Sequence, residues 1–253
     1  MPRTGKLISE SGYYHIIVRG NGKQILFEND SDRQFYLEYL HRLTSEAGIA
    51  ILAWCLMDNH GHFIIDDPSD RLSEVMRRVN GTYAQRYNNA SEHVGHVFQG
   101  RYVRRPINSD AYLLELVRYV HNNPEKARIC PADKYRWSSY KEYVGVPFIS
   151  ETAMVLEMLG GPKEFRQFCQ ERVDPAVWLA SELNPDTETL MMIAREALGG
   201  TNPMEVGSLN RVVRNQCLQK LRETGFSLRQ IERLTGLGKS TIANVTVDKR
   251  DCP

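Results

Sequence analysis

Two histidines separated by one residue are the first feature of the sequence that could carry chemistry. His60 and His62 lie in the stretch Asp58-Asn59-His60-Gly61-His62. Side chains at positions i and i+2 of a β-strand project from the same face, so both imidazoles can reach one metal ion while residue 61 points the other way. Two histidines that merely pack in a fold would give the same pattern, so the pair alone leaves both interpretations open.

A tyrosine and an asparagine near residue 120 form the second group. Tyr119 and Asn123 stand at positions i and i+4, so on a helix they share one face and bring a phenol and an amide oxygen into one site. Pro124 fixes where that face ends, because proline cannot continue a helix. The alternative is structural: Tyr119 packs its ring in the core and Asn123 caps the helix.

Basic and aromatic residues alternate in segment 98–105, whose sequence is FQGRYVRR. An extended segment of this kind suits a strand that follows the phosphates of a nucleic acid and offers rings to its bases. Arg101, Arg104 and Arg105 are therefore candidate DNA contacts. The solubility of an ordinary edge strand explains the same pattern equally well.

The spacing of apolar residues predicts the elements that must position these groups. Short β-branched and aromatic runs indicate strands, and apolar residues at three- and four-residue intervals indicate helices. In chain order we expect a strand at 13–19, a helix from about 30 to 47, strands at 49–57 and 60–65, a helix from about 69 to 88, an extended run at 97–107 and a helix from Asp110 that Pro124 ends. The first six elements fit a ferredoxin-like βαββαβ sheet of the α+β class with helices on one face. The seventh is an extra helix that can carry a site.

The C-terminal part of the sequence is helical in pattern. Residues 146–206 are acidic, with prolines and glycines as punctuation, and are interpreted as a helical connector. A helix is then expected at about 209–223, a second from Ser227 with a capping box to Gln230, and a third at about 239–245 after a glycine turn. Two short helices joined by a glycine-containing turn are typical of a helix-turn-helix.

The net charge hides two basic segments. The chain has 253 residues and a formal net charge of +1, which by itself argues against a nucleic-acid partner. Counted by segment, residues 71–141 carry +7 and residues 207–253 carry +5, and acidic segments cancel both. A solvated helix face explains either cluster alone. Two basic segments that coincide with the motifs above favour binding of a polyanion.

Composition and cysteine use exclude several classes of protein. The chain is 25% charged and 42% hydrophobic, which indicates a folded chain rather than a disordered or collagen-like one. Its five cysteines are widely separated and form no Cys-x-x-Cys pair, so no zinc ribbon or disulfide framework is expected. The apolar runs are too short to span a membrane, and the N-terminus lacks the apolar region of a signal peptide. We therefore expect a cytoplasmic protein with no membrane partner.

Five motifs in a fixed order resemble a known family. They are Gly12-x-x-His15 with Arg19-Gly20, Met57-x-Asn59-His60-x-His62, Phe98-Gln-Gly-Arg101-Tyr102, Arg118-Tyr119-x-x-x-Asn123-Pro124 and Trp137-Ser138-Ser139-Tyr140. Together they resemble the single-tyrosine HUH transposases, and among these the REP-associated tyrosine transposases and their domesticated relatives. The resemblance covers roughly residues 1–145, and five ordered motifs are far more specific than a His-x-His pair.

The resemblance implies a function and a role for named residues. Enzymes of this family cut single-stranded DNA by transesterification and leave a 5′-phosphotyrosine and a free 3′-hydroxyl. Tyr119 would be the nucleophile, and His60, His62 and Asn123 would hold a Mg²⁺ or Mn²⁺ ion that polarises the scissile phosphate. The candidate DNA contacts in this part of the chain are Arg19, Arg101, Arg104 and Arg105.

Two positions depart from the family pattern. Gly61 stands where the family has a bulky hydrophobe, and Asp58 stands where proline is usual. In a strand, residue 61 faces the core behind the two histidines, so glycine is expected to forgo apolar burial of about 1–3 kcal/mol and to loosen the strand. Both histidines are retained, so we expect weaker metal affinity rather than loss of the chemistry. A decayed enzyme is the alternative.

The last expected helix carries the residues most suited to reading duplex DNA. The stretch 238–241, GKST, lacks the first glycine of a phosphate-binding P-loop, since that position is Arg233. The exposed front of a recognition helix is assigned instead to Lys239, Ser240, Thr241 and Asn244. Residues 207–246 resemble the helix-turn-helix of the Trp-repressor and replication-initiator type. A three-helix cap that packs on the nuclease domain is the alternative.

The sequence predicts that the chain is divided into three segments. We expect a nuclease domain at 1–145, an acidic helical connector at 146–206 and a helix-turn-helix at 207–253. The leading hypothesis is a transposase or DNA strand transferase that cleaves and rejoins single-stranded or hairpin DNA, such as REP-like elements, while its tail contacts duplex DNA. A regulator that binds DNA without cutting it and an RNA-binding or RNA-cutting protein are the alternatives. A monomer is favoured over a dimer.

Overall fold

A four-stranded antiparallel sheet forms the frame of the N-terminal half. The computed structural model describes residues 9–91, 94–182 and 185–245. Its strands are β1 (Tyr13–Arg19), β2 (Ala50–Met57), β3 (His60–Asp66) and β4 (Val103–Ile107). Their order across the sheet is β2-β3-β1-β4. With one helix between β1 and β2 and another between β3 and β4, this is the ferredoxin-like βαββαβ arrangement, so the expected α+β fold is confirmed.

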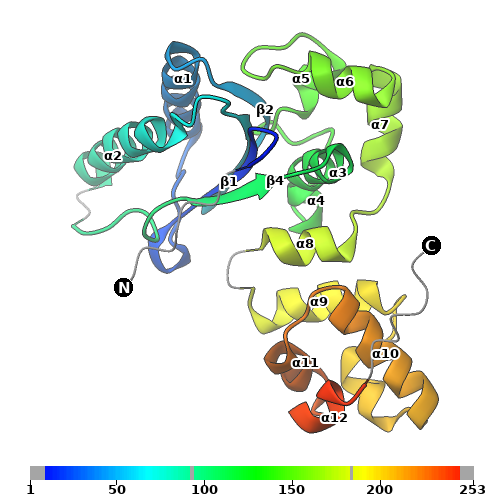
Figure 1. Ribbon diagram of the computed structural model, residues 1–253. Helices are drawn as coiled ribbons and strands as arrows, with labels where there is room; N and C mark the ends of the chain where they lie inside the picture. The colour runs from blue at the N-terminus through cyan, green and yellow to red at the C-terminus, as the bar shows by residue number, and fades with distance from the viewer. Residues whose placement is uncertain (1–8, 92–93, 183–184, 246–253) are drawn as a thin grey trace. The chain divides into compact units, whose positions relative to one another are not determined.

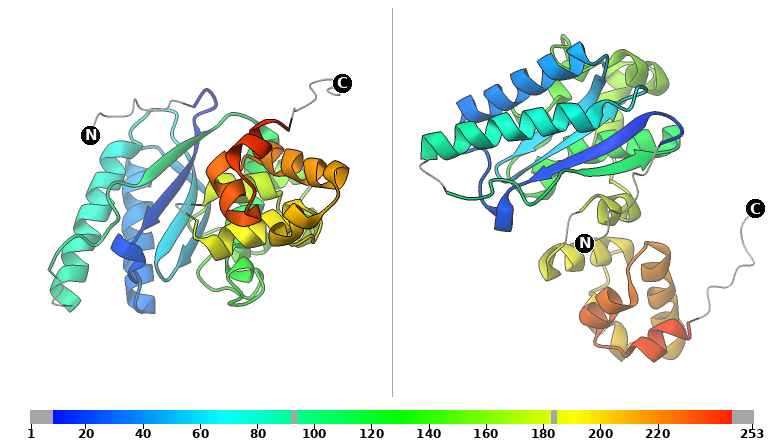
Figure 2. Two further views of the ribbon diagram at one scale, coloured as in Figure 1. Left: turned by 90° about the horizontal axis from the view of Figure 1, so that it is seen from below. Right: turned by 60° about the vertical axis from the view of Figure 1, so that its left-hand side comes forward.

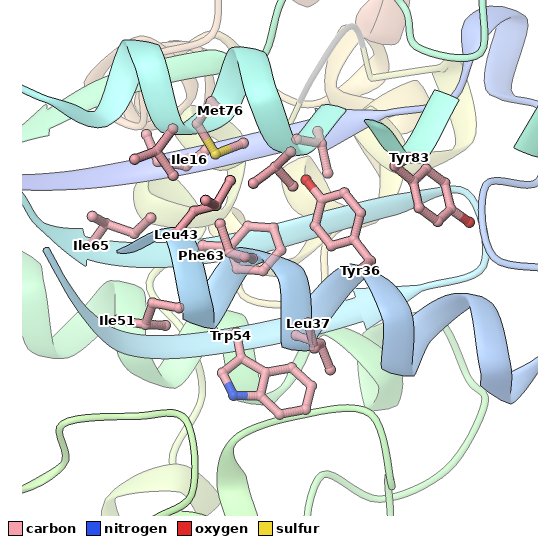
Figure 3. Close-up of a cluster of buried hydrophobic side chains, with 14 of the residues drawn as sticks. Ile16, Tyr36, Leu37, Leu43, Ile51, Trp54, Phe63, Ile65, Met76 and Tyr83 are labelled. Carbon is pink, nitrogen blue, oxygen red and sulfur yellow. The ribbon is translucent and has the colours of Figure 1, made fainter. Parts of the chain in front are cut away.

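Helices α1 (Asp30–Glu46) and α2 (Leu72–Ser91) cover one face of the sheet (Figures 1 and 2). Side chains alternate along a strand, so every second residue, such as Ile16 and Phe63, is buried beneath these helices. Figure 3 shows part of the resulting core, in which aromatic rings pack between helix and sheet. The labelled members are Ile16, Tyr36, Leu37, Leu43, Ile51, Trp54, Phe63, Ile65, Met76 and Tyr83.

Helix α3 (Asp110–His121) and the single turn α4 (Asn123–Lys126) lie across the other face. The sequence predicts one helix ended by Pro124, whereas α3 ends at His121 and Pro124 is the second residue of the new turn. The break follows from the chemistry of proline, whose nitrogen cannot donate to the carbonyl four residues earlier. Helical hydrogen bonding resumes at once, because the Asn122 N–H donates to the carbonyl of Arg118 (2.9 Å) and the Lys126 N–H donates to the carbonyl of Asn122 (3.0 Å).

The outer edge of β2 is covered by the segment 137–139. The backbone N–H of Leu56 donates to the carbonyl of Trp137 (2.8 Å), and the N–H of Ser139 donates to the carbonyl of Trp54 (2.9 Å). The Ser139 hydroxyl accepts the N–H of Trp54 in return (2.9 Å). This pairing protects an edge that would otherwise be open to another strand.

Three further helices complete the first of two compact units, Met1–Arg172 and Val173–Pro253. They are α5 (Tyr140–Val144), α6 (Ala153–Leu159) and α7 (Pro162–Gln170). The expected connector at 146–206 is therefore divided: α6 and α7 pack within the first unit, and the rest packs within the second. The physical reason is apolar burial, since Phe165 of α7 stacks on Tyr143 of α5 with ring centroids 4.5 Å apart.

The second unit has a core of its own. Its elements are α8 (Pro175–Ser181), α9 (Thr187–Ala197), η2 (Pro203–Ser208), α10 (Arg211–Glu223), α11 (Leu228–Thr235) and α12 (Lys239–Ala243). The core draws buried residues from α9 as well as from the last three helices, including Ile193, Leu218, Ile231 and Ile242. The last three helices thus belong to a larger helical unit that begins before residue 207.

The turns between the last three helices follow the chemistry of their residues. Gly225 and Gly236 have positive φ angles of 101° and 71°, which favour glycine. Ser227 and Gln230 form the expected capping box, in which the Ser227 hydroxyl accepts the Gln230 N–H and the Gln230 side chain accepts the Ser227 N–H. The three helices lie where the sequence predicts them to within two residues.

Four cysteines, Cys55, Cys130, Cys169 and Cys217, are free thiols, and Cys252 lies outside the described residues. Within the described ranges, none of the helices combines the length and apolar character needed to cross a membrane.

Candidate active site

Three histidines share the sheet face that α3 crosses. His60 and His62 stand two residues apart on β3, and their ring centroids are 5.0 Å apart. His15 lies on the neighbouring strand β1, and its ring stacks on that of His62 at 5.2 Å. The alternation of a strand places residues 60 and 62 on this face and residue 61 on the face of the core.

Tyr119 reaches this face from α3. Its ring lies edge-on to that of His62, with centroids 5.3 Å apart and an interplanar angle of 89°. The tyrosine is 0% exposed. A buried phenol that contacts a buried imidazole places the candidate nucleophile beside a candidate metal ligand.

Asn123 completes the group even though the helix breaks before it. Its side chain hydrogen bonds with His60. The turn α4 follows α3 closely enough that Asn123 stays on the side of Tyr119, as the i, i+4 spacing predicts. The structure therefore brings Tyr119, His60, His62 and Asn123 into one site.

The Nδ1 atoms of both β3 histidines are already held by neighbours. The Nδ1 of His60 lies 2.7 Å from the Oδ1 of Asn59, and the Nδ1 of His62 lies 3.0 Å from the Nε2 of His15. A hydrogen bond to one ring nitrogen fixes the orientation of the ring and presents the other nitrogen for ligation. Asn59 and His15 thus orient the two candidate ligands.

The sequence gives no role to His15 by local spacing, because its hydrogen bond to His62 joins residues that are 47 positions apart. The signal that could have found it is the strand pairing, in which His15 stands opposite Ile64, two residues beyond His62 on β3. The other histidine left without a role, His121, is buried away from the site, where its Nε2 lies 2.7 Å from the Ser139 hydroxyl.

Burial keeps the histidines of the site neutral. Burial, with a smaller contribution from the Arg19 charge, lowers the pKa of His60 from 6.5 to about 4. Burial and the charge of Arg105 lower the pKa of His15 to about 3. Burial, followed by the neighbouring His60 and His15, lowers the pKa of His62 well below its ordinary value. Neutral imidazole is the form that coordinates a metal.

Positive side chains surround these neutral rings. Arg19 at the end of β1 pairs with His60 across the strands, and Arg105 of β4 pairs with His15. Lys126 of α4 places its Nζ 4.3 Å from the centroid of the Tyr119 ring. All three residues are half-buried, and the Lys126 Nζ itself is buried, so positive charge lines the rim of the site close to the rings.

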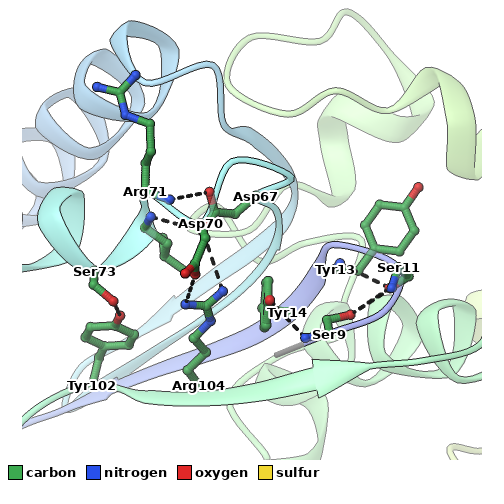
Figure 4. Close-up of polar contacts among 11 residues, drawn as sticks. Ser9, Ser11, Tyr13, Tyr14, Asp67, Asp70, Arg71, Ser73, Tyr102 and Arg104 are labelled. Carbon is green, nitrogen blue, oxygen red and sulfur yellow. Dashed lines mark hydrogen bonds and ion pairs between the residues drawn. The ribbon is translucent and has the colours of Figure 1, made fainter. Parts of the chain in front are cut away.

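Arg104 does not belong to this rim, and its assignment as a DNA contact is corrected. It points to the opposite face, where its guanidinium lies 3.6 Å from the centre of the Tyr14 ring. Its side chain is 8% exposed and pairs with Asp70 (2.9 Å) and Asp67 (3.6 Å) (Figure 4). Asp67 also accepts the Leu72 N–H at the start of α2, so Arg104 ties β4 to that helix.

Gly61 does not loosen the strand, contrary to the expectation from its sequence. A Cβ built on Gly61 would approach the Leu56 Cδ2 to 2.9 Å, the Phe63 Cε2 to 3.1 Å and the Val18 Cγ2 to 3.2 Å. Neighbouring side chains thus fill the space that a bulky residue would take, so no gap lies behind the two histidines. The glycine is part of a closely packed core, and a larger residue here would require the Leu56, Phe63 and Val18 side chains to shift.

Asp58 has a structural role at the turn between β2 and β3. Its carboxylate forms an ion pair with Arg33 of α1. Its carbonyl accepts the N–H groups of Leu26 (2.7 Å) and Phe27 (3.0 Å), and the carbonyl of Asn59 accepts the N–H of Gly20 (2.9 Å). The turn that carries His60 is therefore fixed on two sides.

The remaining candidate contacts lie on exposed surfaces. Arg101 is exposed in the loop before β4. In the second unit Lys239 forms an ion pair with Glu232 (3.4 Å) and is half exposed. The assigned residues Lys239, Ser240 and Thr241 of α12 and Asn244 at its C-cap are all exposed.

The N-terminal part of the chain matches a known family. Residues 9–123 match the family model for IS200-like transposases. This part of the chain is an IS200-like transposase domain. The matched residues include the three histidines of the site, Tyr119 and Asn123.

Solved structures similar to this chain include two with transposase descriptions. A REP-associated tyrosine transposase bound to a REP hairpin aligns over 57% of this chain and 86% of its own, with 16% identity and a TM-score of 0.49. A protein from Deinococcus radiodurans described as a transposase aligns over 48% of this chain and 97% of its own, with 17% identity and a TM-score of 0.32. No curated protein matches the chain.

The candidate ligands of the transposase domain suit a divalent metal ion that takes both nitrogen and oxygen ligands. Within the described part of the chain, no group of three or more His, Cys, Asp or Glu residues could hold a metal ion. The site instead offers two neutral imidazoles, His60 and His62, and the amide oxygen of Asn123. Imidazole and amide oxygen together suit Mn²⁺ as well as Mg²⁺.

Proposed function

We propose that this protein cleaves and rejoins single-stranded DNA through Tyr119, which forms a covalent 5′-phosphotyrosine. The observation that carries the proposal is the contact between Tyr119 and His62, whose rings lie edge to face at 5.3 Å in a domain of the IS200-like family. A phenol held beside two neutral imidazoles has the parts that a phosphoryl-transfer site needs: a nucleophile and ligands for a cation.

The reaction exchanges one phosphodiester bond for another. The Tyr119 oxygen bonds to the phosphorus, and the bond from the phosphorus to the 3′-oxygen breaks. The phenolic proton passes to solvent and the 3′-oxygen takes up a proton, so charge and protons balance. A 3′-hydroxyl that attacks the phosphotyrosine reverses the step and rejoins the strand, which requires no external energy source.

His60, His62 and Asn123 are proposed to hold a Mg²⁺ or Mn²⁺ ion. When bound, the ion supplies a Lewis acid that polarises the scissile phosphate. The chain's own contribution is orientation: Asn59 and His15 hold the two Nδ1 atoms, so each imidazole presents its Nε2.

The proposed substrate is a hairpin or single strand such as a REP-like element, as the five motifs imply. We assign contacts with the DNA phosphates to Arg19 and Arg105, which pair with His60 and His15 across the strands, and to Arg101, which is exposed in the loop before β4. We assign the contacts to duplex DNA to the second unit, through its helix-turn-helix and the exposed residues Lys239, Ser240, Thr241 and Asn244.

The enzyme is proposed to act as a monomer. Tyr119 contacts His62 of its own chain, and Asn123 hydrogen bonds with His60 of its own chain. Each proposed catalytic part therefore comes from a single copy, and no second chain is required to supply the tyrosine.

The test is incubation of the full chain with hairpin oligonucleotides and Mn²⁺, followed by denaturing gel electrophoresis. We expect a covalent adduct with wild type, none with Tyr119→Phe, and an undiminished adduct with Tyr112→Phe, a matched control from the first turn of the same helix. The same hairpin made of RNA is expected to give no adduct. An absent wild-type adduct, or one that persists in Tyr119→Phe, would refute the proposal.

A further inference from the structure

We propose that Lys126 is a further catalytic residue of the site and that its ammonium group binds the scissile phosphate. The inference rests on the proposed function, because it needs Tyr119 as the nucleophile. Neither the His-x-His pair nor the Tyr119–Asn123 pair points to Lys126, and the family model ends at residue 123, before this lysine.

The first observation is the position of the ammonium group. The Nζ of Lys126 lies over the face of the Tyr119 ring, 4.3 Å from its centroid. The tyrosine is fully buried, and the Lys126 Nζ is buried beside its ring although the lysine as a whole is half-buried. A phosphate bonded to the phenolic oxygen of the same tyrosine therefore lies within reach of this ammonium group.

The second observation is that the backbone of α4 fixes the lysine in this place. Lys126 follows Asn123 by three residues, and positions i and i+3 of a helical turn share a face. The turn is closed by hydrogen bonds from the Lys126 N–H to Asn122 (3.0 Å) and from the Ala127 N–H to Asn123 (3.0 Å). The turn that brings Asn123 to His60 therefore also brings Lys126 to Tyr119.

The third observation is the charge of the surroundings. Lys126 shares the site with two arginines, since Arg19 pairs with His60 across the strands and Arg105 pairs with His15. The charged residues that interact with the three histidines are Arg19, Arg105, Lys126 and Asp58. Three of these four are cations, and Asp58 pairs with Arg33. Such a site favours an anion.

A lysine is suited to this position because of its shape. Its ammonium is a compact charge on a flexible four-carbon stem, so it can move from the ring face to the oxygens of a phosphate. As the Tyr119 oxygen bonds to phosphorus and the bond to the 3′-oxygen breaks, Lys126 keeps its proton and donates hydrogen bonds to the non-bridging oxygens. Such a donor is most effective where charge develops in the transition state.

The test separates this contact from general attraction to DNA. The position of cleavage is first mapped with wild type. Binding of two oligonucleotides to the full chain is then measured in the Tyr119→Phe background, which cannot react. One has a phosphodiester at the mapped position, and the other has an uncharged methylphosphonate there. The variants compared are Lys126→Gln, Lys126→Met, which keeps the alkyl stem over the ring, and the control Lys163→Gln, an exposed lysine of the same unit.

Loss of Lys126 is expected to weaken binding of the phosphodiester by about 10- to 100-fold and to leave binding of the methylphosphonate unchanged. Lys163→Gln should affect both oligonucleotides equally. With Tyr119 present, Lys126→Gln should slow adduct formation by about 10²- to 10³-fold, and Lys126→Arg should recover part of the rate.

Two results would overturn the inference, and they are distinguishable. An adduct with wild type, combined with equal weakening of both oligonucleotides by Lys126→Gln and Lys126→Met, would show that the lysine only packs on the ring or attracts DNA generally. Absence of an adduct with wild type would refute the proposed function, and this inference with it.

Discussion

His62 is the residue on which the site converges. It bonds to His15 (3.0 Å), lies next to His60 and receives the edge of the Tyr119 ring. A ring held from several sides has little freedom to rotate, so its Nε2 is aimed before any ligand arrives. At the scale of single residues, the site is therefore defined as much by the partners of the two ligands as by the ligands.

Replacing His15 is expected to weaken metal binding without removing a ligand. His15→Ala deletes the partner of the His62 Nδ1, and the ring is then free to turn, so Mn²⁺ affinity should fall by about 10- to 100-fold. His15→Gln retains a side-chain acceptor and should recover part of the loss. Isothermal titration of the full chain with Mn²⁺ measures both, and equal affinity of His15→Ala and wild type would contradict the role.

Acid is expected to destabilise the protein through its buried histidines. Burial lowers the pKa of His121 from 6.5 to about 3, so the native state keeps this ring neutral while the unfolded chain takes up a proton below pH 6.5. Its contribution to the free energy of unfolding is full above pH 6.5 and falls with pH from there towards about 3, by about 1.4 kcal/mol per pH unit.

The variant His121→Phe isolates that contribution. A phenyl ring fits among the neighbouring Tyr140, Tyr143 and Phe165 rings and carries no proton. Urea unfolding gives the free energy of unfolding between pH 7 and pH 5. In this variant it should fall less steeply as the pH decreases, and the difference in slope should correspond to about one proton. An unchanged slope would show that His121 is not held neutral in the native state.

At the scale of elements, helix α3 is held by α7 as well as by the sheet. Arg118 of α3 forms ion pairs with Glu171 (2.7 Å) and Glu115, and its guanidinium lies 4.3 Å from the centre of the Phe168 ring. The Asn122 side chain donates to the carbonyl of Cys169 (2.9 Å). Residues beyond the family domain thus fix the helix that carries the nucleophile.

Loss of the Arg118 contacts is expected to destabilise the protein. Arg118→Met removes a side chain that is 6% exposed and leaves its acidic partners unpaired, so unfolding should become easier by about 1–3 kcal/mol. Glu171→Gln removes only the more exposed partner and should change stability by less than about 1 kcal/mol. Urea unfolding gives both values. An Arg118→Met chain as stable as wild type would contradict the role of α7.

At the scale of the whole molecule, local patterns predicted the frame and much of the site. Apolar spacing located the four strands, and the i, i+4 spacing placed Asn123 with Tyr119 even though Pro124 breaks the helix. These features depend on near neighbours in the chain, so sequence contains them directly.

Features that depend on strand order could not be predicted in the same way. The role of His15 depends on β1 lying beside β3, and the structural role of Arg104 depends on the face of β4 that packs under α2. The packing around Gly61 depends on Leu56 and Val18, which come from the neighbouring strands β2 and β1 and fill the space. The division of 146–206 between two units follows from tertiary contacts, which charge alone does not specify.

The two units predict a separation of tasks. A chain that ends at Arg172 retains the sheet, α3 and the contacts between α3 and α7. It should therefore unfold cooperatively and still form the adduct with single-stranded DNA. It should lose the duplex contacts proposed for the second unit. Circular dichroism and fluorescence anisotropy with single-stranded and duplex probes measure this, and equal duplex binding by the shortened and full chains would refute the division.

The central claim is that Tyr119 becomes covalently bonded to DNA. The most direct measurement is mass spectrometry of the protease-digested complex formed between the full chain and a hairpin oligonucleotide. The account predicts a single modified peptide, in which Tyr119 carries the 5′-phosphate of the cleaved strand and the released fragment ends in a 3′-hydroxyl. A modification on any other residue, or cleavage without a linked peptide, would contradict it.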